Sequence, residues 1–160
     1  MSTTVTHLWK PSNARYLKVD GFLATPRGPQ IPPPQALVWP EKDPSDTLDY
    51  VFDIGPALAA DFGDGIDSLE VQISPSNPGD LTLLSSAVEG TRVVLWMSGG
   101  QVQTVYTVTI VAGTAGGRTL ARSIMLPVVQ LAFPAVAPDA LTITVDQALT
   151  DPEGVVITTI

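Results

Sequence analysis

The sequence predicts an all-β protein folded as an antiparallel β-sandwich, and three observations indicate this class. Residues 104–111 are almost all β-branched or aromatic, which suits a half-buried strand better than a helix. A glycine-rich turn at 113–118 can reverse the chain into an antiparallel partner at about 119–129. Short strand patterns recur through the middle of the chain, and no amphipathic helical stretch of useful length interrupts them.

The first 40 residues differ from the rest, because seven prolines remove backbone donors and restrict φ. They predict an extended N-terminal arm over residues 1–40, with a polyproline II segment at 31–34. Two alternatives are open for the aromatic residues of this arm. They dock onto another subunit, or Trp9, Phe22 and Trp39 fold back onto their own domain.

Residues 41–129 carry the strands of the predicted sandwich. Alternating apolar and polar residues predict strands at 46–54 and 68–73, and two more patterns follow at 81–88 and 91–97. The side chains expected to face the core are Leu48, Tyr50, Phe52, Ile54, Leu69, Val71, Ile73, Tyr106, Val108 and Ile110. The glycines assigned to turns rather than to a site are Gly99, Gly100, Gly116 and Gly117.

Residues 130–160 are predicted to form a C-terminal β-rich tail. Strand-like runs at 141–145 and 155–160 bracket a turn around 151–154, which predicts a terminal hairpin. Two strands alone are marginally stable in water. We therefore expect this tail to pack on the sandwich or on a neighbouring chain.

Composition excludes several classes of function. The net charge of −8, with no local cluster of Lys or Arg, opposes direct binding to a nucleic-acid backbone. The chain has no cysteine, so disulfides, thiolate metal sites and cysteine nucleophiles are impossible. No run of about 18 apolar residues is present, and we expect a protein made in the cytoplasm without membrane insertion.

No set of residues predicts catalysis, a metal or a cofactor. The single histidine, His7, lies in the arm without a nucleophile nearby, so we expect no enzyme. The carboxylates of Asp61, Asp64 and Asp67 can surround a cation, or they can form a solvated acidic turn. Likewise, Trp96 can join a sugar-stacking platform with the other tryptophans, or it can cover the sheet, which its apolar strand favours.

Four short motifs carry a resemblance to a known family. They are Lys42-Asp43-Pro44, the segment 94–100, the strand 105–109 and the turn 114–119. In this order and spacing, residues 41–129 resemble the immunoglobulin-like domain of tailed-bacteriophage fibre–tail adaptor proteins. The resemblance implies an immunoglobulin-like β-sandwich flanked by the N-terminal arm and the C-terminal tail.

The resemblance further implies a structural virion protein without an active site, assembled in the host cytoplasm. Its implied partners are portal, tail or fibre subunits and copies of itself in a symmetric ring. The residues expected to face these partners are aromatic or apolar and lie in the arm and the tail: Trp9, Tyr16, Phe22, Trp39, Ile143, Val145, Ile157 and Ile160. The alternatives are a head-decoration or head-fibre protein and a carbohydrate-binding β-sandwich module.

Overall fold

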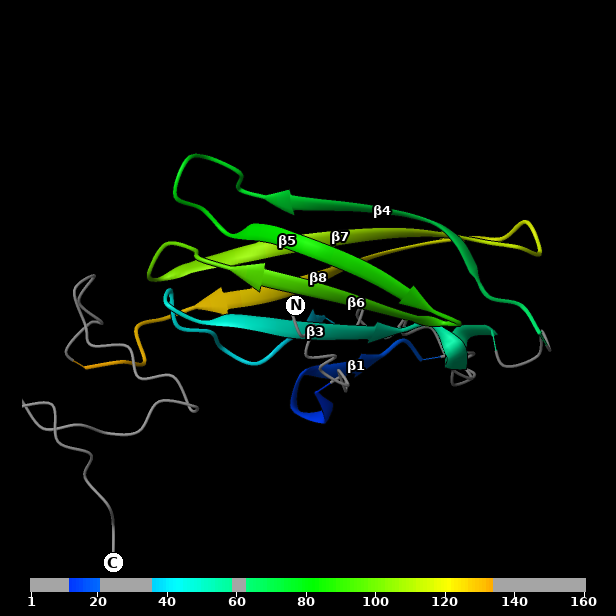
Figure 1. Ribbon diagram of the computed structural model, residues 1–160, viewed down its shortest axis with the longest axis horizontal. Coiled ribbons are helices and arrows are strands. Elements are labelled where there is room, and N and C mark those ends of the chain that lie inside the picture. The colour runs from blue at the N-terminus through cyan, green and yellow to red at the C-terminus, as the bar shows by residue number, and fades with distance from the viewer. Residues whose placement is uncertain (1–11, 21–35, 59–62, 134–160) are drawn as a thin grey trace, which may run out of the picture.

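The protein folds as two four-stranded β-sheets packed face to face (Figure 1). The computed structural model describes residues 12–20, 36–58 and 63–133. Its strands are β1 (Tyr16–Lys18), β2 (Leu37–Val38), β3 (Thr47–Asp53), β4 (Ile66–Ser74), β5 (Thr82–Glu89), β6 (Arg92–Ser98), β7 (Thr104–Thr114) and β8 (Thr119–Val128). Two short 3-10 helices, η1 (Asn13–Arg15) and η2 (Gly55–Leu58), precede β1 and follow β3.

The strand order is that of an immunoglobulin-type sandwich. One sheet has the order β1-β3-β6-β5 and the other β2-β8-β7-β4. These orders correspond to strands A-B-E-D and G-F-C of the constant-type immunoglobulin domain, with β2 added beside G. The predicted all-β sandwich is therefore confirmed, with one correction. The sheets are mixed rather than purely antiparallel, because β1 runs parallel to β3 and β2 runs parallel to β8.

The hairpin predicted over residues 104–129 is present, and a second hairpin joins the two strand patterns on either side of Gly90. The terminal hairpin predicted at 141–160 lies outside the described residues. β5 and β6 pair antiparallel around Gly90, and β7 and β8 pair antiparallel through the turn that contains Gly117. Both glycines have positive φ, of +62° and +81°, a region that other L-residues adopt only with strain. The expected strands therefore meet through the expected turns.

The core lies between the inner faces of the two sheets. Tyr106, Val108 and Ile110 are fully buried there, as the alternation of β7 predicts. β4 also shows the predicted pattern, since its inward residues are partly buried and its outward residues are exposed. Leu95 and Met97 of β6 are fully buried and contribute to the same apolar cluster.

β3 departs from the predicted pattern, because both of its faces are buried. Its inward residues Tyr50 and Phe52 lie in the core as expected, but Asp49, Val51 and Asp53 on the other face are also buried. The reason is that β1 pairs with the edge of β3, and the side chains of Arg15 and Tyr16 extend over the outer face to bind Asp49 and Asp53. A strand expected to have one solvated face is thus covered on both.

Two segments of the predicted N-terminal arm are strands of the sandwich. β1 joins one sheet and β2 joins the other, although both precede residue 41. Val19 and Trp39 are buried in the core, at 3% and 2% exposure. The indole of Trp39 lies 5.2 Å from the ring of Tyr50 and donates a hydrogen bond of 3.3 Å to the carbonyl of Val51. Of the two alternatives for Trp39, the structure places it back onto its own domain.

A buried tyrosine fixes the corner between β6 and β7. The hydroxyl of Tyr106 donates to Asp80 Oδ1 at 2.7 Å and accepts from the backbone N–H of Gln101 at 2.8 Å. This arrangement corresponds to the tyrosine corner of immunoglobulin-like domains, where a tyrosine near the start of strand F bonds to backbone a few residues upstream. The backbone N–H of Asn77 donates to the other oxygen of Asp80, so one carboxylate joins two loops.

Lys42 and Asp43 hold the chain where it leaves β8. The Lys42 side chain is fully buried and its Nζ donates to the carbonyls of Asp43 and Gly99. Asp43 Oδ2 accepts from the backbone N–H groups of Leu131 and Ala132, at 2.7 and 2.9 Å. A hydrogen bond from the backbone N–H of Ser45, followed by those from Ala132 and Leu131, lowers the pKa of Asp43 to about 2. We call Lys42 and Asp43 the exit clamp.

Candidate partner-binding surface

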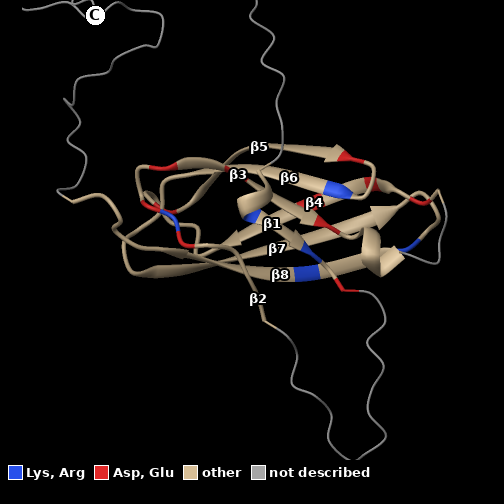
Figure 2. Ribbon diagram, turned by 90° about the horizontal axis from the view of Figure 1, so that it is seen from below, with Lys and Arg blue, Asp and Glu red and all other residues tan. Residues whose placement is uncertain are grey.

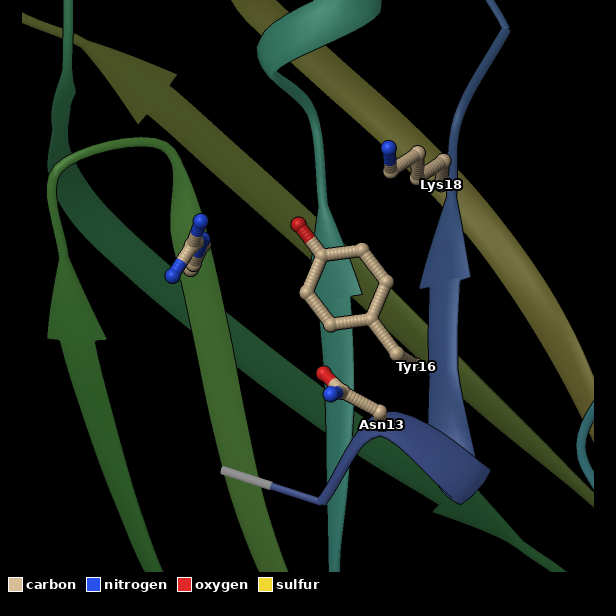
Figure 3. A pocket seen from close by; sticks show the side chains of 4 residues that line it. Asn13, Tyr16 and Lys18 are labelled. Carbon is tan, nitrogen blue, oxygen red and sulfur yellow. The ribbon is translucent and has the colours of Figure 1, made fainter. Parts of the chain in front are cut away.

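The outer face of the β1-β3-β6-β5 sheet carries a depression of about 450 Å³ lined by Asn13, Tyr16, Lys18 and Arg92. Figure 3 shows the ring of Tyr16 lying over β3, with Lys18 and Asn13 nearby. Lys18 Nζ and Arg92 Cζ each lie 5.7 Å from the ring centroid. We call this feature the Tyr16 depression.

Register explains how these residues meet. Tyr16 pairs with Val51 and Lys18 with Asp53 across β1 and β3, while Asp53 pairs with Arg92 across β3 and β6. Side chains of directly paired residues lie on the same face of a sheet. Three strands that are distant in sequence therefore present their side chains side by side.

Asp53 binds most of the polar groups beneath the depression. The Tyr16 hydroxyl donates to Asp53 Oδ2, while the Gly55 N–H and the Thr91 hydroxyl donate to Oδ1 at 2.8 and 2.9 Å. Burial alone raises the pKa of Asp53, but these hydrogen bonds outweigh it, so the pKa lies below its ordinary value. The pKa of Tyr16 is raised, first by burial and then by Asp53, so the phenol remains a hydrogen-bond donor.

Asp49 makes a second network beside the first. Arg15 binds Asp49 through its carboxylate and its carbonyl, each at 2.7 Å, and the N–H of Ser12 donates to the other carboxylate oxygen at 2.8 Å. Burial raises the pKa of Asp49, but these bonds outweigh burial, and its pKa is lowered. Both carboxylates are therefore ionised at neutral pH and occupied in holding η1 and β1 against β3.

The cations of the depression remain accessible to a partner. The side chain of Arg92 is 48% exposed, and its ion pair with Asp53 is long, at 4.0 Å. Lys18 is exposed and makes its ring contact with Tyr16, but it forms no ion pair or hydrogen bond with a residue that the structure describes. The arrangement offers an aromatic face between two positive charges.

The predicted partner-facing residues fall into three groups. Tyr16 lies at the centre of the depression, whereas Trp39 is buried in the core. The others lie outside the described residues: Trp9, Phe22, Ile143, Val145, Ile157 and Ile160. Sequence reasoning missed Lys18 and Arg92. The two-residue spacing from Tyr16 could have placed Lys18 on the same face, but Arg92 carries no local signal.

In the acidic loop before β4, the carboxylate of Asp64 has a structural role. Asp64 accepts from the N–H of Gly116 at 2.9 Å and forms an ion pair with Arg118 at 2.9 Å. Its side chain is only 6% exposed, so it joins this loop to the β7–β8 turn instead of lying in solvent. Asp67 is exposed, and Asp61 lies outside the described residues.

Metal-binding clusters and membrane-spanning helices are both absent from the described residues. No group of three or more His, Cys, Asp or Glu residues gathers there as a metal site would require. No described helix is long and apolar enough to cross a membrane.

Comparison with known proteins identifies the family. Residues 42–127, which form most of the sandwich, match the family profile described as Gp77, podophage GP4 fiber-tail adaptor protein gp77. No curated protein sequence matches the chain. Because the family match covers more than half of the 160 residues, this chain belongs to the podophage fibre–tail adaptor family and has a structural role in the phage tail.

Proposed function

We propose that this protein is a non-enzymatic subunit that joins receptor-binding fibres to the tail or portal-proximal machinery of the phage particle. Membership of the adaptor family carries this proposal. The chemistry of the described residues supports it, since the carboxylates with lowered pKa values are all engaged in hydrogen bonds that hold loops and strands together.

The Tyr16 depression is the proposed docking site on the rigid sandwich. A half-buried aromatic residue between cations suits an acidic side chain of a partner, because the cations attract the carboxylate and the ring supplies apolar contact. The site also stands out against the chain's net charge of −8, since three of its eight basic residues, Arg15, Lys18 and Arg92, lie on this face.

The arm and the tail are proposed as further attachments. Their apolar side chains are proposed anchors on portal, tail or fibre subunits: Trp9, Phe22, Ile143, Val145, Ile157 and Ile160. Copies of the chain would form a symmetric ring, so that several weak contacts act together. The proposed location is the virion, after assembly in the host cytoplasm, without direct contact to nucleic acid.

A charge reversal tests the docking site. Particles would be assembled with Lys18→Glu protein, and fibre occupancy would be counted by electron microscopy. The matched control is Arg122→Glu, an exposed cation on β8 of the other sheet that bonds only to the adjacent carbonyl of Ala121 within the described residues. Lys18→Glu should reduce fibre occupancy several-fold, while Arg122→Glu should leave it unchanged.

Two outcomes would contradict the proposal. Full fibre occupancy with Lys18→Glu would show that the Tyr16 depression is not part of the interface. Density for the protein on the capsid, away from tail and fibres, would favour the alternative of a head-decoration or head-fibre protein. Both measurements use the same particles.

A further inference from the structure

β5 is the edge strand of the sandwich that is least protected against pairing with another chain. Within the described residues it pairs with β6 on one side and has no strand on the other. All of its residues except Leu83 are exposed, including the large apolar Leu84 at 58% and Val88 at 41%. An exposed edge strand presents unpaired N–H and C=O groups that can pair with another chain.

The other three edges are better protected against added strands. β1 and β2 have only three and two residues. β4 has a bulge between Ile66 and Ser68 and carries the exposed acidic residues Asp67 and Glu70. Bulges, charges and short length are the usual means of blocking edge pairing.

β5 lacks most of these protections. It contains no proline, lysine or arginine, and its single charge, Glu89, is its last residue. A bulge between Leu83 and Ser85 leaves residues 85–89 in regular pairing with β6. The small residues Ser85, Ser86 and Ala87 permit a close backbone approach, and Leu84 and Val88 offer apolar contacts at either end. The edge therefore favours an uncharged β-strand.

The end of the described chain lies near the beginning of β5. The exit clamp holds Leu131 and Ala132, and Lys42 Nζ bonds to the carbonyl of Gly99. A Cβ placed on Gly99 would lie 3.5 Å from the carbonyl oxygen of Asp80, two residues before β5. Figure 1 shows the same arrangement, with β8 ending at the end of the sandwich where β5 starts. The tail therefore leaves at the end of the sandwich where this edge begins.

The remaining tail has the composition that this edge favours. Residues 141–145 and 155–160 are strand-like runs without any charged residue, and residues 134–160 contain no lysine or arginine. The seven residues 134–140 can span up to roughly 25 Å, and a strand of eight residues is about 27 Å long. The length of chain is therefore sufficient to reach and cover a neighbouring edge.

We infer that a strand from residues 134–160 of one copy adds to β5 of the neighbouring copy. This inference rests on the proposed ring of adaptor subunits. Each copy then donates one tail and accepts one, and a repeated head-to-tail contact of this kind closes into a ring. Main-chain hydrogen bonds supply the attachment, as in other cases of strand addition. The contact also buries Leu84 and Val88.

Cross-linking tests the inference directly, because the chain has no native cysteine. Particles would be assembled from an equal mixture of Ser86→Cys and Thr144→Cys proteins and treated with a short bis-maleimide. A covalent pair can form only between copies, since no single chain carries both cysteines. The control mixture replaces Ser86→Cys by Gln72→Cys on the β4 edge, which is also exposed. We expect dimers from the first mixture and none above background from the control.

Other results would overturn the inference. Absence of dimers from the first mixture, or equal dimers from both mixtures, would exclude β5 as the specific acceptor. If particles of the Ser86→Cys, Thr144→Cys double variant cross-link only within single chains, the tail covers its own edge instead. A second variant, Ser86→Pro, removes a β5 N–H that faces away from β6, because alternate residues of an antiparallel strand bond to its partner. It should reduce tail cross-linking to Val88→Cys, with the sandwich checked by circular dichroism.

The two proposals fail in distinguishable ways. If tail cross-links are absent but Lys18→Glu still removes fibres, strand addition is wrong and the adaptor function stands. If tail cross-links form but the ring lies away from the tail and fibres, the adaptor function is wrong and strand addition stands.

Discussion

The hydroxyl of Tyr106 offers the sharpest test of how this sandwich is held together. Replacing Tyr106 with Phe keeps the ring in the core and removes a group that bonds to both Asp80 and Gln101. One of these bonds ends on a carboxylate, and a hydrogen bond to a charged group contributes about 1.5–3 kcal/mol. We expect the free energy of unfolding to fall by about 2–3 kcal/mol, because the Gln101 N–H also loses its partner.

Tyr50 supplies a matched control for this substitution. Both tyrosines are fully buried, but the Tyr50 hydroxyl has no hydrogen-bond partner among the described residues. Burial raises the pKa of Tyr50 to about 12, so the group is a neutral phenol. A buried hydroxyl without a partner is destabilising. Tyr50→Phe should therefore leave stability unchanged or increase it.

The measurement is urea denaturation at pH 7, supported by thermal melts. For a chain of this length, 1 kcal/mol corresponds to about 2–4 °C in Tm, so Tyr106→Phe should lower Tm by roughly 4–12 °C. Equal effects of the two substitutions would refute the reasoning, because they would show that the hydrogen bonds of Tyr106 do not contribute to stability.

Acidification gives a second readout for the same carboxylate. Hydrogen bonds from Asn77 and then from Tyr106 lower the pKa of Asp80 below its ordinary value of 3.8. An acid whose pKa is lowered by folding stabilises the protein above its unfolded pKa, and this contribution is lost as the pH falls through the folded value. Tyr106→Phe should weaken this loss, because the pKa of Asp80 moves back toward 3.8. An unchanged pH profile would contradict the assignment.

Three other substitutions test separate features. Trp39→Ala should cost about 3–5 kcal/mol, as expected for a buried tryptophan, and a cost near zero in denaturation would contradict its place in the core. Gly100→Ala should destabilise the protein more than Gly117→Ala. Both glycines have positive φ, but of the two only Gly100 would place its new Cβ against another side chain, 2.9 Å from Val128. Similar melting temperatures for the two variants would argue against this crowding. Burial lowers the pKa of Lys42 below 10.5, so stability should rise with pH from the folded pKa up to 10.5, and Lys42→Met should abolish that slope in denaturant titrations.

Local sequence patterns predicted the central strands well. The alternation in β7, the turn at Gly117 and the strand β8 lie next to one another in sequence, so side-chain period and turn chemistry were sufficient. The same holds for β5 and β6 around Gly90. These elements depend on contacts between residues close in the chain.

The contributions of the first 40 residues could not be predicted in this way. β1 and β2 are too short to show a period of two, and their parallel pairing depends on where β3 and β8 lie. The sequence likewise predicts a solvated outer face for β3, because the segment that covers this face is distant in the chain. Its burial requires Arg15 and Tyr16, which lie 34 and 37 residues from the carboxylates that they bind.

The candidate site depends on the same long-range register. Tyr16 was recognised as an aromatic residue in an unusual segment, but its position between Lys18 and Arg92 follows from the pairing of β1, β3 and β6. Figure 2 shows basic residues at only a few separate places along the ribbon, so composition gives no sign that two of them meet at one ring. Only the fold brings the two cations to one ring.

The parallel pairing of β2 with β8 has a mechanical consequence for a protein that links other components. A pull that enters before Leu37 and leaves after Val128 acts on neighbouring strands that point in the same direction. Such a load shears the hydrogen bonds of Trp39, Lys42 and Val129 simultaneously and does not open them one at a time. The hydrogen bonds between β8 and the segment from β2 to Lys42 therefore resist tension along this path together.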